Sequence, residues 1–167
     1  MLLVSTAFAN WKLDNFQYTP ERQLTVLQMS YVGFGIDVEV RNFPYTKGVE
    51  DVTSAFMAKI HDRAARGEVR YVTAEVHGPL TYHKYVSTDN GQMYGNITVI
   101  YSLANNDVTI VHFRVKVAQE MQIDWREFTT FVQKNWNTVL HAFEQQTIQS
   151  FAQKLAPAVQ AVPHKAP

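Results

Sequence analysis

Three histidines fall within one run of predicted strands and could together bind a metal ion. His77 and His83 flank the turn of the first hairpin in that run, and His112 lies two strands further along. Three imidazoles are a known ligand set for zinc. No carboxylate stands at a fixed spacing from them, and such histidines are more often surface residues. The sequence therefore predicts no metal site and no cofactor.

Two carboxylates, Asp37 and Glu39, are candidates for acid–base chemistry. Such chemistry requires paired carboxylates in a cleft, or a nucleophile beside a base. Asp37 and Glu39 alternate with apolar residues, which indicates the solvent-facing side of a strand. The chain has no G-x-S-x-G motif, and Gly33-Phe34-Gly35 lacks the third glycine of a dinucleotide fingerprint. We therefore expect a protein that is not an enzyme.

Basic and aromatic residues in the same region could form a sheet surface on which nucleic-acid bases stack. They are Lys84, Arg114, Lys116, Tyr82, Tyr85 and Tyr94. Between residues 68 and 118, however, four basic residues are matched by four acidic ones. The whole chain also balances 15 basic against 15 acidic residues. Because no net positive field attracts phosphates, we expect no nucleic acid as the main partner.

The composition suits one domain with a large apolar content. The 167 residues are 46% hydrophobic and only 18% charged, so part of the surface must be uncharged or apolar. The absence of cysteine excludes disulfides and cysteine-ligated metals. No stretch is long enough to span a membrane, and the first ten residues lack the basic start of a secretion signal, so we expect a soluble protein.

Residues 68–118 predict a meander of four antiparallel strands, which is the clearest feature of the sequence. The predicted strands are residues 68–77, 81–88, 92–103 and 107–118. Gly78-Pro79, Asp89-Asn90-Gly91 and residues 104–107 are the turn-forming residues between them. In the last strand His112, Arg114 and Lys116 face one side, and the valines and Phe113 face the other.

Two helices are predicted. The first begins near Val49, carries acids in its first turn and bases near its end, and stops before Gly67. The second covers residues 124–155, opens with Asp124 and Glu127 in a capping-box-like arrangement, and is expected to end at Pro157. At about 1.5 Å per residue it would be roughly 45 Å long, which exceeds what strands of ordinary length need for cover.

The N-terminal third is harder to interpret. Residues 1–8 suit a strand or an apolar arm, and residues 11–18 suit a loop. Thr19-Pro20-Glu21 has the features of a helix start, so we expect a short helix that passes into a strand over residues 24–34. Residues 35–43 alternate cleanly between apolar and charged side chains and predict a half-buried strand.

Together these elements predict an α+β fold in a single domain over residues 1–156, followed by an extended arm over residues 157–167. The sheet is mostly antiparallel, with the meander and one or two N-terminal strands, and both helices are expected to cover one face. Over residues 49–155 the order of elements resembles the helix-grip fold of START-like carriers. That resemblance implies a cavity for a hydrophobic ligand, whereas Val, Phe and Trp opposite the helix suggest filled space.

We therefore expect a non-enzymatic structural subunit of a larger assembly, with a homo-oligomer or other protein subunits as partners. A virion component of a phage tail, neck or capsid is one concrete setting. The helix-grip ligand carrier is the alternative, and a small enzyme built from Asp37, His112 or Tyr85 ranks last. The candidate partner-binding residues are Leu2, Leu3, His112, Arg114, Lys116, Phe151, Leu155 and Val162.

Overall fold

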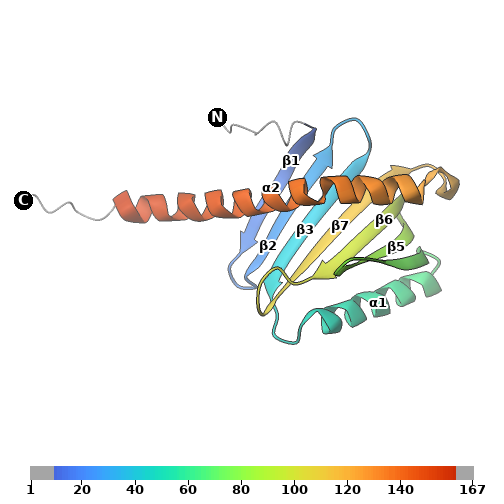
Figure 1. Ribbon diagram of the computed structural model, residues 1–167, viewed down its shortest axis with the longest axis horizontal. Helices are drawn as coiled ribbons and strands as arrows, with labels where there is room; N and C mark the ends of the chain where they lie inside the picture. Colours follow the sequence, from blue (N-terminus) through green and yellow to red (C-terminus); the bar gives the residue numbers. More distant parts are fainter. Residues whose placement is uncertain (1–9, 161–167) are drawn as a thin grey trace, which may run out of the picture.

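The structure is a computed structural model that describes residues 10–160, with side chains described through residue 153. Within that range the chain forms seven strands and two α-helices (Figure 1). They are β1 (Trp11–Thr19), β2 (Leu24–Tyr31), β3 (Ile36–Pro44), α1 (Val49–Ala65), β4 (Val69–His77), β5 (Leu80–Asp89), β6 (Gln92–Tyr101), β7 (Asp107–Val117) and α2 (Trp125–Gln160). A single 3-10 turn, η2 (Glu120–Gln122), precedes α2.

All seven strands form one antiparallel sheet in the order β1-β2-β3-β7-β6-β5-β4. The pairing of β3 with β7 joins the N-terminal hairpins to the meander, with Ile36 opposite Val115 and Pro44 opposite Asp107. The predicted α+β class with a mostly antiparallel sheet is therefore confirmed. Within the residues that the structure describes, the sheet has three N-terminal strands rather than one or two.

One face of the sheet packs against α2 and encloses the main core. Its fully buried side chains include Leu27, Val38, Val40, Ile97, Val99, Val111, Phe113, Val132 and Val139. Both outer strands of the described sheet reach the same part of α2, since Trp11 of β1 bonds to Asn135 and His77 of β4 bonds to Gln133. The sheet therefore curves around the helix.

Helix α1 packs against the opposite face, which corrects the prediction that both helices share one face. Alternation along β5 directs Tyr82 and Val86 into the core beneath α2, whereas Tyr85 packs against Ile60 of α1. The side of the sheet that faces α2 is already filled by the longer helix and its aromatic residues. Periodicity within α1 shows that it has an apolar stripe but does not show which face of the sheet receives it.

The N-terminal third also differs from the prediction. Residues 11–19 form β1 rather than a loop, and residues 24–31 form β2 without a preceding helix. The expected helix start at Thr19 is instead a tight turn, in which the Arg22 amide bonds to the Thr19 carbonyl at 3.3 Å. The alternating pattern decided the outcome because Leu27 and Met29 become buried against α2 once β2 pairs with β3.

The other predicted elements agree with the structure, with one shift at the end of α2. The four strands of the meander and helix α1 are confirmed. Asp124 caps α2, since its side-chain oxygen accepts a 3.0 Å hydrogen bond from the Glu127 amide. The helix continues past Pro157 to Gln160, so the prediction that Pro157 ends it is wrong. The expected arm beyond the helix lies outside the described residues.

Candidate functional site

The face of β1, β2, β3 and β7 that points away from α2 is only partly covered, and we call it the open face. It contains a polar cleft of about 340 Å³. The residues that line the cleft are Asp14, Gln28, Met29, Asp37, Val38, Glu39, His112 and Arg114. Alternation places Asp37 with Glu39 on β3 and His112 with Arg114 on β7, as the sequence predicted, and the pairing of β3 with β7 brings the two pairs together.

The charged groups of the cleft are largely paired with one another. Arg114 lies 3.2 Å from Asp37, and its guanidinium lies 4.3 Å from the centre of the Tyr94 ring. Burial alone would raise the pKa of Glu39, but hydrogen bonds from Arg41 and Gln28 outweigh it and hold that pKa below its ordinary value. Glu39 is therefore an ionised and already bonded carboxylate at neutral pH.

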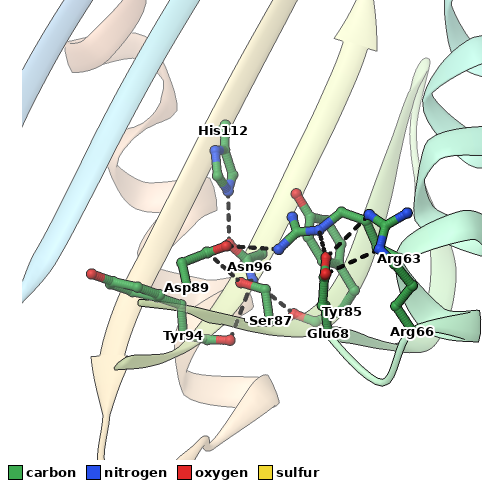
Figure 2. Close-up of polar contacts among 9 residues, drawn as sticks. All are labelled: Arg63, Arg66, Glu68, Tyr85, Ser87, Asp89, Tyr94, Asn96 and His112. Carbon is green, nitrogen blue, oxygen red and sulfur yellow. Dashed lines mark hydrogen bonds and ion pairs between the residues drawn. The ribbon is translucent and has the colours of Figure 1, made fainter. Parts of the chain in front are cut away.

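His112 connects the cleft to a buried polar network beneath α1 (Figure 2). Its Nε2 lies 2.8 Å from the side-chain oxygen of Asn96. The Asn96 side-chain nitrogen donates to the Ser87 hydroxyl at 2.9 Å and to two backbone carbonyls. Since that amide oxygen accepts, Nε2 of His112 carries the proton and Nδ1 is the basic nitrogen. Burial lowers the pKa of His112 to about 4.

The network continues from β5 to α1 through charged groups. Ser87 donates to Asp89 at 3.3 Å, and Arg63 of α1 donates to Asp89 at 2.6 Å and to Glu68 at 3.2 Å (Figure 2). The Tyr85 ring stacks against His112, with ring centres 6.3 Å apart. The bonds between Asn96 and Ser87 satisfy buried polar groups, and the ion pair between Arg63 and Asp89 attaches α1 to the end of β5. They therefore have a structural role.

The chemistry available to this network is limited. A general base works best when its pKa lies near the operating pH. The neutral imidazole of His112, with a pKa of about 4, is a weak base at pH 7. Neither Ser87 nor Tyr85 has this ring as a hydrogen-bond partner, because both bond to other groups. The geometry favours a structural histidine over a catalytic one.

The structure separates the residues that could have formed a metal or base-stacking site. His77 lies on the α2 side, with its ring centre 4.4 Å from that of Tyr82, whereas His83 and His112 lie on the other side. Lys84 is buried on the α2 side and contacts Glu75. Among the described residues, no group of three or more histidines and carboxylates is suited to hold a metal ion.

The C-terminal part of α2 leaves the body of the protein and extends into solvent (Figure 1). We call residues 144–160 the projecting end. Among the side chains of α2 that the structure describes, Phe143 is the last buried one, and beyond it Ile148 and Phe151 are 60% and 64% exposed. An apolar groove of about 790 Å³ runs beside the start of the projecting end. The residues that line it are Leu103, Asn137, Leu140, His141, Phe143, Glu144, Thr147 and Ile148.

A second apolar groove, of about 310 Å³, lies where α2 begins. Tyr31, Phe34 and Phe131 line part of it, and Phe34 is 67% exposed. Sequence reasoning considered Phe34 only as part of a rejected glycine motif and did not identify Ile148. A pattern in the sequence could have identified Ile148 as a contact residue, because it is an apolar residue within an uncharged, glutamine-rich stretch.

The predicted partner-binding residues divide into three groups. His112, Arg114 and Lys116 lie on the same side of β7, and Lys116 is exposed. Phe151 is exposed on the projecting end. Leu155 belongs to α2 but its side chain is not described, and Leu2, Leu3 and Val162 lie outside the described residues.

None of the helices within residues 10–160 combines the length and apolar character needed to cross a membrane.

Comparison with other proteins adds no relative from which a function could be transferred. No protein-family model matches the sequence, and no curated protein matches it.

Proposed function

We propose that this protein is a non-enzymatic structural subunit that assembles with other protein subunits through the projecting end of α2. One observation carries the proposal: a helix that leaves the domain presents two large apolar side chains, Ile148 and Phe151, to solvent. Contiguous exposed apolar surface on a folded domain is typical of an interaction site.

The weak packing of the projecting end against its own domain supports this proposal. Most of the stability of a helix in a protein comes from packing of its apolar side. Residues 144–153 are exposed or only partly buried, so the domain itself contributes little to their stability. Burying Ile148 and Phe151 would contribute roughly 1.5–3 kcal/mol each. A partner at this helix would therefore stabilise it.

The open face supports a role without catalysis. Its carboxylates are bonded to Arg114, Arg41 and Gln28, and its histidine has a pKa of about 4. Such a surface is polar and electrostatically balanced, and it suits a secondary contact with another subunit. The virion setting inferred from the composition stays a prediction.

The helix-grip ligand carrier is less well supported. That function requires free space between the last helix and the sheet. In this protein Phe113, Val132 and Val139 fill the interface and are fully buried. The sheet curves around α2 as in a grip, but side chains occupy the region in which a ligand would lie.

Light scattering on the full chain at several concentrations tests the proposal. We expect a mass above the 19.1 kDa of one chain, and a decrease to that mass in the double variant Ile148→Gln, Phe151→Gln. Glutamine preserves helix propensity and matches the neighbouring residues. Met121→Gln is the control, because Met121 is 85% exposed but lies outside the projecting end. A full chain that remains a monomer at every concentration would contradict the proposal.

A further inference from the structure

We infer that the projecting end of α2 pairs with the same segment of a second copy in an antiparallel, two-fold symmetric dimer, with Ile148 of each copy opposite Phe151 of the other. The inference rests on the proposed function and adds the identity and the geometry of the partner. It combines the exposure of these two residues, the charge of the segment and the position of the adjacent groove.

The charge of the segment favours an identical partner. Residues 145–153 contain no charged residue, and their polar residues are Gln, Thr and Ser. An acidic or basic partner would therefore find no complementary charge there. An identical helix meets no like-charge repulsion, and side-chain amides can both donate and accept hydrogen bonds. The segment is self-complementary in charge and in hydrogen bonding.

The direction of α2 favours antiparallel pairing. The helix points away from the domain, so two antiparallel projecting ends place the two domains at opposite ends of the pair (Figure 1). Parallel pairing would bring both domains to the same end. A two-fold interface of this kind uses the same patch on both copies.

The positions of Ile148 and Phe151 set the register. When Ile148 of one copy lies opposite Phe151 of the other, the two-fold axis passes between residues 149 and 150. Any residue then faces the residue of the second copy whose number, added to its own, gives 299. Residues 151–159 of one copy then lie beside residues 140–148 of the other. Leu140, Phe143, Thr147 and Ile148, which line the 790 Å³ groove, fall within that range. The groove would therefore receive the last turns of the second copy's helix.

The length of α2 is sufficient for this pairing. Residues 140–160 are helical and extend over about 30 Å at 1.5 Å per residue. In the sequence, Leu155 follows Ile148 by seven residues, which is the repeat of helices that pair side by side. The backbone thus continues far enough to reach the groove of the second copy.

Disulfide trapping tests the register, and the absence of native cysteine makes the result simple to read. One full-length chain carries Ile148→Cys, a second carries Phe151→Cys, and the two are oxidised separately and as an equimolar mixture. A disulfide requires Cα atoms about 4.4–6.8 Å apart. Random pairing would make half of all disulfide dimers mixed. We expect a fraction of mixed dimers well above one half in the mixture, and little dimer from either chain alone. Met121→Cys, at an exposed position outside the projecting end, is the control for disulfides that form by random collision between chains.

Each outcome separates the inference from the proposed function. Dimers that form equally well from each chain alone would indicate parallel pairing, and a native mass above two chains would exclude a dimer. Either result overturns the inference while the proposed function survives. If neither variant forms disulfides faster than Met121→Cys and the full chain is a monomer, both fail. Mixed dimers together with a mass of two chains would support the inference.

Discussion

Nε1 of Trp11 donates a 3.1 Å hydrogen bond to the side-chain oxygen of Asn135, which joins the first strand to the middle of the last helix across 124 residues of sequence. The Trp11 side chain is buried, and its ring also contacts Tyr31 and Phe131. Asn135 in turn donates to the Phe131 carbonyl at 2.9 Å. This bond secures the β1 edge of the sheet to α2.

Trp11→Phe should therefore lower the free energy of unfolding by about 1–3 kcal/mol, because it removes the hydrogen bond and leaves a small void. Urea denaturation measures the change. Combined with Asn135→Ala in a double-mutant cycle, the coupling energy should be about 0.5–1.5 kcal/mol. Strictly additive effects of the two substitutions would show that the bond does not contribute to stability.

Gly95 of β6 leaves little room for a side chain. A Cβ atom there would lie 3.0 Å from Cδ1 of Ile123 and 3.2 Å from Cγ1 of Val115. Gly95→Ala should cost roughly 1–3 kcal/mol of stability through overpacking. Ile123→Val removes the nearest atom, so the double variant should be more stable than the sum of the two single effects predicts. Thermal and urea unfolding of the four proteins measure this, and an additive result would argue against the clash.

Stability should depend on pH through His112. Its pKa of about 4 in the folded protein lies below the ordinary value of 6.5, chiefly because burial disfavours the charged ring. Below pH 6.5 the unfolded state therefore binds a proton that the folded state does not. The free energy of unfolding should fall as the pH drops from 6.5 toward 4, by up to about 3 kcal/mol, and stay level for this group above pH 6.5.

The contribution of His112 can be isolated by comparing unfolding at pH 7 and pH 5. His112→Gln should reduce the loss of stability between the two pH values. His83, whose pKa is also lowered by burial, contributes in the same direction and should leave a residual slope. His61→Gln, on an exposed position of α1, is the control. An unchanged slope in His112→Gln would contradict the assignment, and an NMR titration of the ring reads its pKa directly.

Helix α1 should open without unfolding of the rest of the protein. Ile60 is its one buried residue among those the structure describes, and it packs with Phe56 against Tyr71 and Tyr85. Ile60→Ala should cost about 2–4 kcal/mol, and α1 amides should lose hydrogen-exchange protection more than amides of β3 and β7. Lys59→Ala, at an exposed neighbouring position, is the control. Equal loss of protection across the protein would show that α1 is part of the global unfolding unit.

Much of the fold follows from local sequence patterns. The meander, α1 and α2 were predictable because alternation, helical spacing, turn residues and caps act over a few neighbouring residues. Alternation also predicted that Asp37 lies with Glu39 and that His112 lies with Arg114. That the two pairs lie together depended on the pairing of β3 with β7. The apolar residue Phe151 was noted from the same periodicity.

Other features depended on contacts between distant parts of the chain. Residues 24–31 satisfied both helical and alternating patterns, and pairing with β3 selected the strand. The side of the sheet that α1 covers depended on α2 filling the other side. The exposure of Ile148 depended on where α2 leaves the sheet, after Phe143.

The sequence by itself thus determined the elements, their apolar sides and the lack of catalytic motifs, because these depend on residue type and spacing. Only the tertiary structure decided which apolar sides are covered and which remain exposed. Burial depends on how much of α2 the sheet can cover, and no single segment of the sequence gives that quantity. The apolar residues Ile148 and Phe151 are exposed because α2 is longer than the sheet that covers it.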